Sequence, residues 1–322
     1  MKNVAVIGGG FSSEFEISIL SCKNIIANFP DTYFPYLVLM TREGWFVEFE
    51  GEKISFDEKE MAFVWEGNKI KIDFSIIYVH GDPGENGKLQ AYFDMMKIPY
   101  LNSGALASEL SFDKWYCNQF LKGFGFNVAK SIYLTDQKDI PLPHAIIELL
   151  GLPLFVKPCD SGSSFGISKV KNEGELKPSI LQAFDEGRTV VVEGFLDGQE
   201  VTCGVYRSSE GIQALPLTEI VSENDFFDFE AKYKGLSDEI TPARISDELT
   251  KKVQEISKDV YNLLQLRSIA RVDFMLVDNE PYIIEVNTNP GFTNESIVPK
   301  MINSAGLSIK EFWREIIEGD LK

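Results

Sequence analysis

Two apolar runs, RVDFMLV and PYIIEVN, stand on either side of a short polar break near the end of the chain. If residues 278–280 form a three-residue loop between antiparallel strands, Asp273 falls directly opposite Glu285. Because side chains alternate between the faces of a strand, Arg271 and Asn287 share the face of those two carboxylates. The pattern therefore predicts a β-hairpin with one polar face and one core face. The predicted core face consists of Val272, Phe274, Leu276, Tyr282, Ile284 and Val286.

The polar face of this hairpin is a candidate metal site. Two carboxylates that face each other across a sheet repel one another unless a cation cancels their charge. Oxygen ligands such as those of Asp273, Glu285 and Asn287 select Mg²⁺ or Mn²⁺ rather than zinc. The alternative is a solvated face on which Arg271 pairs with Asp273, and the spacing alone does not separate the two interpretations.

Composition limits the class of protein. The chain has 322 residues, of which 44% are hydrophobic, so it can bury a large core in two or three domains. A formal net charge of −18 makes it a poor partner for nucleic acid or an anionic membrane. No apolar stretch is long enough for a signal peptide or a membrane span. The four cysteines include no C-x-x-C pair, so we expect a cytoplasmic protein with free thiols.

Strand and helix patterns alternate along the first third of the chain. Short β-branched runs at Asn3–Ile7, Tyr36–Met40 and Phe74–Val79 are separated by polar or helical segments. This alternation predicts an open α/β unit with a parallel sheet over roughly residues 1–113.

A loop rich in glycine and serine, DSGSSFG, follows a predicted strand that ends near Lys157. Small residues let backbone N–H groups approach an anion closely, and Lys157 adds a positive charge. The Walker A pattern is absent and a strand rather than a helix follows, so the segment predicts a hairpin flap over phosphates. The alternative is an ordinary flexible turn.

Three further segments carry polar groups near predicted strand ends. In GGGFSSEFEIS, Glu14 lies in the first turn of a helix at the carboxyl edge of the sheet, where ligands bind in such folds, although helix capping also explains it. In VHGDPGENG, His80 is either a substrate contact or a structural turn residue. The segment FDFEAKYKG, with Lys232 and Tyr233, indicates a loop.

Taken in order, the segments GGxSSExEIS, HGxxGExG, VKPxxxGSSxGI, EAKY, RVDF and ExNTxPGFTxxS resemble those of the D-alanine–D-alanine ligase family, within the ATP-grasp superfamily. The resemblance extends from Val4 to about Gly306. It implies an α/β, three-domain ATP-grasp architecture: an N-terminal substrate-binding domain with an open parallel sheet (1–113), a central lid domain (114–192) and a C-terminal domain with the metal and oxyanion site (193–322).

The resemblance also implies a reaction. The carboxylate of one D-alanine attacks the γ-phosphate of ATP and becomes an acyl phosphate, which the amine of a second D-alanine then attacks as phosphate leaves. The dipeptide serves bacterial peptidoglycan synthesis. Two Mg²⁺ or Mn²⁺ ions in each active site and a homodimer are further implications.

Residue roles follow by the same resemblance. The metal ligands are Asp273, Glu285 and Asn287. The catalytic set is Glu14, which receives the ammonium of the first D-alanine, Ser163 of the flap, Tyr233 of a closing loop, and Arg271 and the Gly291 N–H at the oxyanion. The substrate contacts are His80 and Ser296. The nucleotide contacts are Lys114, Lys157, Ser163, Ser164, Glu193, Phe195, Leu196, Glu200 and Lys232.

Several positions depart from the family pattern. Phe15 stands where a basic residue or histidine is common, and Asn86 where an acid is frequent. Gly194 replaces a frequent lysine and so removes a possible adenine contact, while Phe227 and Phe229 occupy places where tyrosines are frequent. Because no metal ligand and no oxyanion arginine is lost, the departures concern nucleotide affinity and loop hydrogen bonds rather than the reaction class.

Three alternatives stay open. A D-alanine–D-lactate or D-alanine–D-serine ligase would use another nucleophile, although Tyr233 argues against D-lactate. Another ATP-grasp carboxylate–amine ligase is disfavoured by the SSE and GFTxxS segments. A non-catalytic nucleotide-binding protein would be expected to lack a metal ligand.

Overall fold

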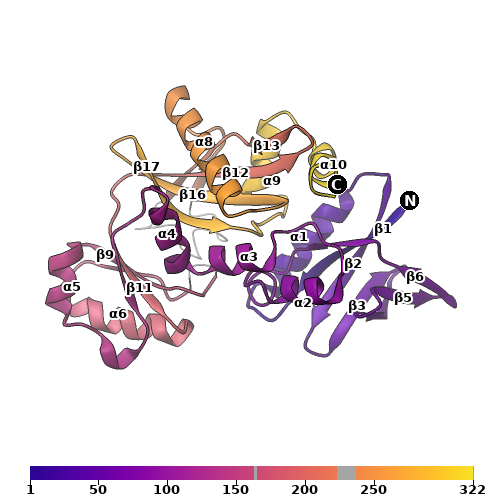
Figure 1. The fold of residues 1–322 in the computed structure, drawn as a ribbon, viewed down its shortest axis with the longest axis horizontal. Helices are drawn as coiled ribbons and strands as arrows, with labels where there is room; N and C mark the ends of the chain where they lie inside the picture. Colours follow the sequence, from indigo (N-terminus) through magenta and orange to yellow (C-terminus); the bar gives the residue numbers. More distant parts are fainter. Residues whose placement is uncertain (163–164, 223–236, 322) are drawn as a thin grey trace.

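The computed structural model describes residues 1–162, 165–222 and 237–321, which form three β-sheets with helices packed against them. Figure 1 places the first sheet on the right, the second at the lower left and the third above and between them. In the described part of the chain, no helix is long and apolar enough to cross a membrane. The four cysteines are free and buried, as the sequence predicts.

The first sheet has seven strands in the spatial order β6-β5-β4-β3-β2-β1-β7. β1 lies parallel to β2 and β7, as predicted, but residues 44–71 add an unpredicted antiparallel meander. Tight turns at Gly51 and Gly67, both with positive φ, take the place of crossover helices there, so the sheet is mixed. Its elements are β1 (Lys2–Gly9), α1 (Phe15–Ala27), β2 (Tyr33–Thr41), β3 (Gly44–Phe49), β4 (Glu52–Asp57), β5 (Ala62–Trp65), β6 (Asn68–Lys71), β7 (Phe74–Ile77), α2 (Lys88–Met96) and α3 (Ala105–Phe112).

The second sheet has four antiparallel strands in the order β10-β9-β11-β8 and is covered by two helices. Buried apolar residues of α5 and α6 pack against it in a separate core. Its elements, with the helix α4 that leads to it, are α4 (Lys114–Gly123), β8 (Ser131–Leu134), a short 3₁₀ helix (Gln137–Asp139), α5 (Pro143–Leu150), β9 (Leu154–Pro158), β10 (Ser168–Val170), α6 (Glu173–Glu186) and β11 (Val190–Gly194).

The third sheet is antiparallel, in the order β15-β14-β12-β16-β17, with β13 paired to β12. Its last two strands are the hairpin predicted from the sequence. The elements of this part are β12 (Gln199–Ser208), β13 (Gly211–Ala214), β14 (Thr218–Ser222), β15 (Ser237–Ile240), α8 (Asp247–Leu263), β16 (Ile269–Val277), β17 (Glu280–Asn287), α9 (Ile297–Ser304) and α10 (Ile309–Asp320).

The hairpin turn is shorter than predicted. Val277 pairs with Glu280, so the turn contains two residues, Asp278 and Asn279, instead of three. Both have positive φ, which is typical of the type I′ turns that suit the twist of a two-residue hairpin.

A β-bulge nevertheless restores the predicted pairing of the polar residues. The register shifts between Asp273 and Phe274, and Phe274 pairs with Ile283. The bulge supplies the residue that the shorter turn removed, so Asp273 still faces Glu285. Beyond the bulge the faces are exchanged: Ile283 is buried in the core, and the prediction that Tyr282 and Ile284 lie on the core face is wrong.

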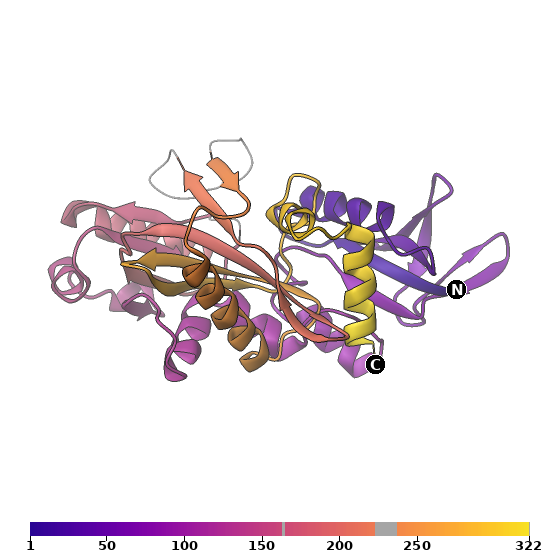
Figure 2. The ribbon, with the colours of Figure 1, turned by 90° about the horizontal axis from the view of Figure 1, so that it is seen from above.

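One hydrophobic core joins the two ends of the chain. Residues of β1, α1 and β7 pack with residues of α9 and α10, including the fully buried Trp313. Figure 2 shows α10, in yellow, beside the first sheet. This packing fixes the loop between β17 and α9 against the carboxyl end of the first sheet.

Candidate active site

The polar face of the hairpin carries four of the predicted residues side by side. The guanidinium of Arg271 donates two hydrogen bonds to Asp273, from Nε to Oδ1 at 2.8 Å and from Nη2 to Oδ2 at 2.7 Å. Asn287 Nδ2 lies 3.1 Å from Asp273 Oδ2 and 3.5 Å from Glu285 Oε1. The hydroxyl of Thr202, on the neighbouring strand β12, also donates to Asp273. The hairpin therefore holds its charged groups in fixed positions.

Arg271 stays cationic in this buried setting. Burial alone would lower the pKa of its guanidinium, but Asp273, with Glu285 and Glu239, raises that pKa above the ordinary value. The arginine is thus a permanent, oriented positive charge in the cleft.

The donor set of the hairpin fits a magnesium or manganese ion. Asp273 and Glu285 offer carboxylate oxygens on one face, and Asn287, whose Nδ2 faces these carboxylates, would offer its amide oxygen after a rotation of the amide group. Among residues 1–162, 165–222 and 237–321, no group of three or more His, Cys, Asp or Glu side chains is placed to hold a metal ion, and the candidate set of the hairpin consists of two carboxylates and one amide. Such an oxygen-only set does not favour zinc.

Lys114 connects the hairpin to the base of the predicted flap. It is the first residue of α4, and Asp113 caps that helix by accepting from the N–H groups of Trp115 and Tyr116. The ammonium of Lys114 donates to the Ser161 carbonyl at 2.7 Å and lies 4.0 Å from Glu285 Oε2. The cap therefore fixes the start of α4 so that the Lys114 ammonium lies between Ser161, at the base of the predicted flap, and Glu285 of the hairpin.

Lys157 and Glu193 form a buried ion pair on the second sheet. Their Nζ and Oε2 atoms are 2.7 Å apart, on adjacent strands β9 and β11. Burial would lower the pKa of Lys157, but Glu193 outweighs it and the pKa is raised. Glu200, on β12, borders the same space from the third sheet.

Glu14 and His80 lie at the carboxyl end of the first sheet. Glu14 precedes α1 and makes no side-chain capping hydrogen bond, so capping does not explain it. His80 is 4% exposed, with Nε2 3.4 Å from the Ser21 hydroxyl. Burial lowers the pKa of His80, although Glu14 opposes the shift, so the imidazole favours its neutral form.

The loop after β17 brings Gly291 and Ser296 beside these residues. The Tyr78 hydroxyl donates to the Pro290 carbonyl at 3.0 Å, and Asn24 Nδ2 donates to the Phe292 carbonyl at 2.8 Å. A Cβ on Gly291 would lie 3.1 Å from the Ser296 hydroxyl oxygen, so a larger residue at this position would crowd Ser296. The first sheet thus positions the loop.

Two cavities border the hairpin, and both are lined by Arg271 and Glu285. One, of about 290 Å³, lies toward the first sheet, and another, of about 120 Å³, lies toward the second. The larger is lined by Glu14, His80, Lys114, Arg271, Glu285, Asn287, Gly291 and Ser296, and the smaller by Lys114, Lys157, Glu200, Arg271, Asp273 and Glu285. Phe195 and Leu196 follow β11 and line neither cavity.

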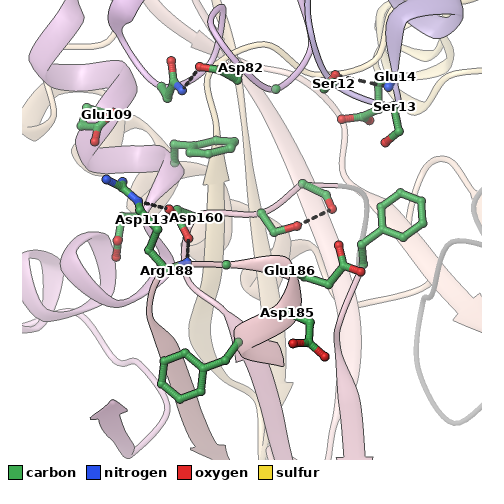
Figure 3. Close-up of a pocket in the computed structure, with 18 of the residues that line it drawn as sticks. Ser12, Ser13, Glu14, Asp82, Glu109, Asp113, Asp160, Asp185, Glu186 and Arg188 are labelled. Carbon is green, nitrogen blue, oxygen red and sulfur yellow. Dashed lines mark hydrogen bonds and ion pairs between the residues drawn. The ribbon is translucent and has the colours of Figure 1, made fainter. Parts of the chain in front are cut away.

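A third and larger cavity, of about 890 Å³, adjoins the first through Glu14, Ser161 and Gly162. Figure 3 shows carboxylates around it and the ion pair of Arg188 with Asp160, whose Nε and Oδ2 atoms are 2.8 Å apart. This cavity opens toward the helices α3 and α6.

Some predictions fall outside the described residues. These are Ser163, Ser164, Lys232 and Tyr233 of the predicted site, and Phe227 and Phe229 among the departures. Of the other departures, Asn86 donates to the Asp82 carboxylate. A Cβ on Gly194 would lie 3.3 Å from the Leu150 carbonyl oxygen, which disfavours a larger residue there.

Two residues of the site were not predicted. Glu85 lines the 290 Å³ cavity and accepts from the Gly81 N–H at 2.7 Å. It lies within the HGxxGExG segment, so its place in that motif could have marked it. Thr202 holds Asp273 by pairing across β12 and β16, and no local pattern predicts a partner 71 residues away.

Known proteins match the whole chain. The family model described as "D-ala D-ala ligase N-terminus" matches residues 3–103, and "D-ala D-ala ligase C-terminus" matches residues 120–318. A protein named D-alanine--D-alanine ligase from Azobacteroides pseudotrichonymphae is 46% identical, over 99% of this chain and 99% of that protein.

Two solved structures are also similar. The VanG D-Ala:D-Ser ligase from Enterococcus faecalis has a TM-score of 0.85 at 30% identity, covering 98% of each chain. The D-alanine--D-alanine ligase from Bacillus anthracis complexed with ATP has a TM-score of 0.79 at 28% identity, covering 100% of this chain and 98% of that one.

Three sheets that meet at one charged cleft, with lysines on one side and a hairpin of carboxylates on the other, define an α/β ligase of the ATP-grasp class. Within that class, the chain belongs to the D-alanine–D-alanine ligase family.

Proposed function

We propose that this chain joins two D-alanine molecules into D-alanyl-D-alanine with ATP, through a D-alanyl phosphate intermediate, for peptidoglycan synthesis in a bacterial cytoplasm. The observation that carries the proposal is the 290 Å³ cavity, in which Glu14 from the first sheet and Arg271 from the third border one space. A carboxylate and a guanidinium in one cavity match the ammonium and carboxylate of an amino acid.

The first D-alanine would bind with its ammonium at Glu14 and its carboxylate on the side of Arg271 and Lys114, which line the same cavity. His80 favours its neutral form, so it adds a polar contact without adding charge. The anchored loop with Ser296 encloses the other side of the substrate. These groups orient the carboxylate that is to attack the γ-phosphate.

ATP would lie across the 120 Å³ cavity, with Lys114 and Lys157 at its phosphates. Phosphoryl transfer needs positioning and charge stabilisation more than covalent help from the protein. Asp273, Glu285 and Asn287 would hold two Mg²⁺ or Mn²⁺ ions. When bound, such ions neutralise charge on the phosphates.

Arg271 and the Gly291 N–H would stabilise the tetrahedral oxyanion that forms when the second amine attacks. Arg271 is held in place by its two hydrogen bonds to Asp273, so it need not reorganise during the reaction. Gly291 is held by the loop that is anchored to Tyr78 and Asn24.

The three-domain division at 1–113, 114–192 and 193–322 is part of this proposal. The three sheets fall largely one to each segment, which supports the division, although the last strand of the second sheet, β11, runs to Gly194 and crosses the boundary at 192. A homodimer rests on family resemblance alone. Size-exclusion chromatography with light scattering would test it: a monomer at micromolar concentration would contradict it.

The nature of the second substrate can be tested by phosphate release. We expect purified enzyme with ATP and Mg²⁺ to release phosphate with D-alanine alone, and to gain little from added D-lactate or D-serine.

A D-alanine–D-serine ligase is the second candidate, because a D-Ala:D-Ser ligase shares this fold at a TM-score of 0.85. Preferential formation of D-alanyl-D-serine from an equimolar mixture would favour it. No phosphate release with any of the three acceptors would contradict the proposal.

A further inference from the structure

The cleft-facing side of the second sheet carries a row of three side chains on neighbouring strands. Lys169 on β10 pairs with Phe155 on β9, and Phe155 pairs with Glu193 on β11. Directly paired residues in a sheet project to the same side. Phe155 lines the 120 Å³ cavity, so Lys169 stands on the side of the sheet that faces the proposed nucleotide.

The ammonium of Lys169 lies against the ring of Phe195, which lines none of the three cavities itself but packs on Phe155, a residue that borders the 120 Å³ cavity; this edge is the rim of the cavity. The Nζ of Lys169 is 4.4 Å from the ring centroid of Phe195. The rings of Phe195 and Phe155 are 6.1 Å apart between centroids and inclined by 34°. On the other ring, Lys157 Nζ lies 5.5 Å from the centroid of Phe155. Two neighbouring rings thus each have one lysine beside them.

The two lysines stand on different strands of the second sheet. Lys157 is locked into its 2.7 Å ion pair with Glu193 and is 12% exposed. Position 194, next along β11, offers no side chain, and a Cβ there would crowd the Leu150 carbonyl. The ammonium that lies beside Phe195 therefore comes from β10, as Lys169, and not from β11.

The cavity has the composition of a site for a flat heterocycle. Phe155 and Ile167 border it from the second sheet, and Met275 and Ile284 border it from the hairpin. Ile284 reaches this side because of the bulge in the hairpin. Apolar side chains on two sheets offer faces to a planar base, and an ammonium at the rim can contact its π-system or a ring nitrogen.

We propose that Lys169 is a positioning residue for the purine base of ATP, contacting the base at the rim formed with Phe195. The inference rests on the proposed function in one respect, namely that the nucleotide occupies the 120 Å³ cavity. Lys169 would then contribute to nucleotide affinity and base selectivity and leave the chemical step nearly unchanged.

Calorimetric binding of two ligands tests this directly. We expect Lys169→Met to weaken binding of a non-hydrolysable ATP analogue about tenfold, the range expected for a partly desolvated cation–π contact. Binding of inorganic tripolyphosphate, which has no base, should not change. Lys169→Arg should restore most of the affinity, and Lys171→Met, an exposed lysine just beyond β10, serves as the matched control.

Two results would overturn the inference. Equal weakening of the ATP analogue and of tripolyphosphate would assign Lys169 to the phosphates or to the stability of β10. Unchanged affinity for both ligands would exclude a nucleotide role. Neither measurement requires turnover, so a wild-type chain that binds the analogue but ligates nothing would contradict the proposed function while leaving the role of Lys169 intact.

Discussion

At the scale of single residues, Glu285 is the point where several charges of the cleft meet. Its carboxylate lies 4.0 Å from the Lys114 ammonium and within 3.5 Å of the Asn287 amide, and it faces Asp273 across the hairpin. The same carboxylate borders both cavities that share the hairpin. A loss of its charge should therefore affect the phosphoryl groups more than the fold.

We predict that Glu285→Gln lowers turnover about a hundredfold or more, as expected for removing one electrostatic group from a catalytic site. Steady-state phosphate release at millimolar Mg²⁺ measures this. Glu280→Gln is a control on the same hairpin, since Glu280 is exposed and pairs with Lys252 outside the cleft. Full activity of Glu285→Gln at ordinary Mg²⁺ would rule out the assigned metal role.

Glu85 makes the stability of the protein depend on pH. Burial, and then the charge of Glu14, raises the pKa of the Glu85 carboxyl to about 8, although the Gly81 N–H and Lys114 act in the opposite direction. The folded chain therefore keeps a proton that the unfolded chain releases above its ordinary carboxyl pKa. The contribution of Glu85 to the free energy of unfolding is fully present below that ordinary pKa and is lost as pH rises toward 8.

Glu85→Gln removes this titration and retains an acceptor for the Gly81 N–H. We expect the variant to gain free energy of unfolding relative to wild type by about 1 kcal/mol per pH unit between pH 5 and 8, with no further gain above pH 8. Urea unfolding at several pH values measures the difference. A difference that does not vary with pH would show that Glu85 is not protonated in the folded chain.

At the scale of elements, the hairpin shows both what local sequence can predict and where it fails. Alternation placed Asp273, Glu285, Arg271 and Asn287 on one face, and that prediction is confirmed. The loop length was wrong, and the bulge that compensates for it was not predicted. A bulge arises from how two strands pair, which a single strand pattern does not encode.

In other elements, too, local patterns in the sequence predict some features, and contacts between distant residues decide the rest. The parallel strands β1, β2 and β7 were predictable because each is a continuous apolar run. The meander of β3 to β6 was missed because its strands are only four to six residues long and partly exposed. The ion pair of Lys157 with Glu193 joins two strands 36 residues apart, so only the folded sheet reveals it.

The helix α4 offers a test of how an element aims a catalytic side chain. Asp113 Oδ1 accepts from the N–H groups of Trp115 and Tyr116 at 3.0 and 2.9 Å. We predict that Asp113→Ala lowers the free energy of unfolding by about 1 kcal/mol, the usual cost of a lost cap, and raises KM for ATP because Lys114 is the next residue. Asp113→Asn, whose side-chain oxygen can still cap the helix, should retain most of the stability and most of the affinity for ATP. Equal losses of stability and affinity in the two variants would mean that the charge of Asp113, and not its capping, is what matters.

At the scale of the whole molecule, the first sheet and the last two helices share one core. Trp313 of α10 is fully buried. It lies against the rings of Phe29, after α1, and Tyr78, after β7, and against the ring of Phe292. No local pattern in the sequence predicts this packing, because it joins residues near the two ends of the chain. It matters for function, since the same packing holds the loop that carries Gly291.

We predict that Trp313→Ala costs about 3–5 kcal/mol and loosens both ends of the chain together. Hydrogen exchange should quicken in β1 as well as in α10, because the two share the core. Leu106→Ala, at a side chain that is 80% exposed, is the control and should change little. Faster exchange confined to α10 would show that the first sheet is stable without it.

The account as a whole claims that a carboxylate of D-alanine becomes an acyl phosphate in the cleft beside Lys114, Arg271 and Glu285. The direct measurement is the fate of the carboxylate oxygen when the enzyme turns over D-alanine labelled with ¹⁸O in its carboxyl group. The account predicts that each dipeptide formed is accompanied by phosphate carrying one ¹⁸O atom, since that oxygen bonds to the γ-phosphorus and leaves with it when the amine attacks. Unlabelled phosphate, released together with D-alanyl-D-alanine, would contradict it.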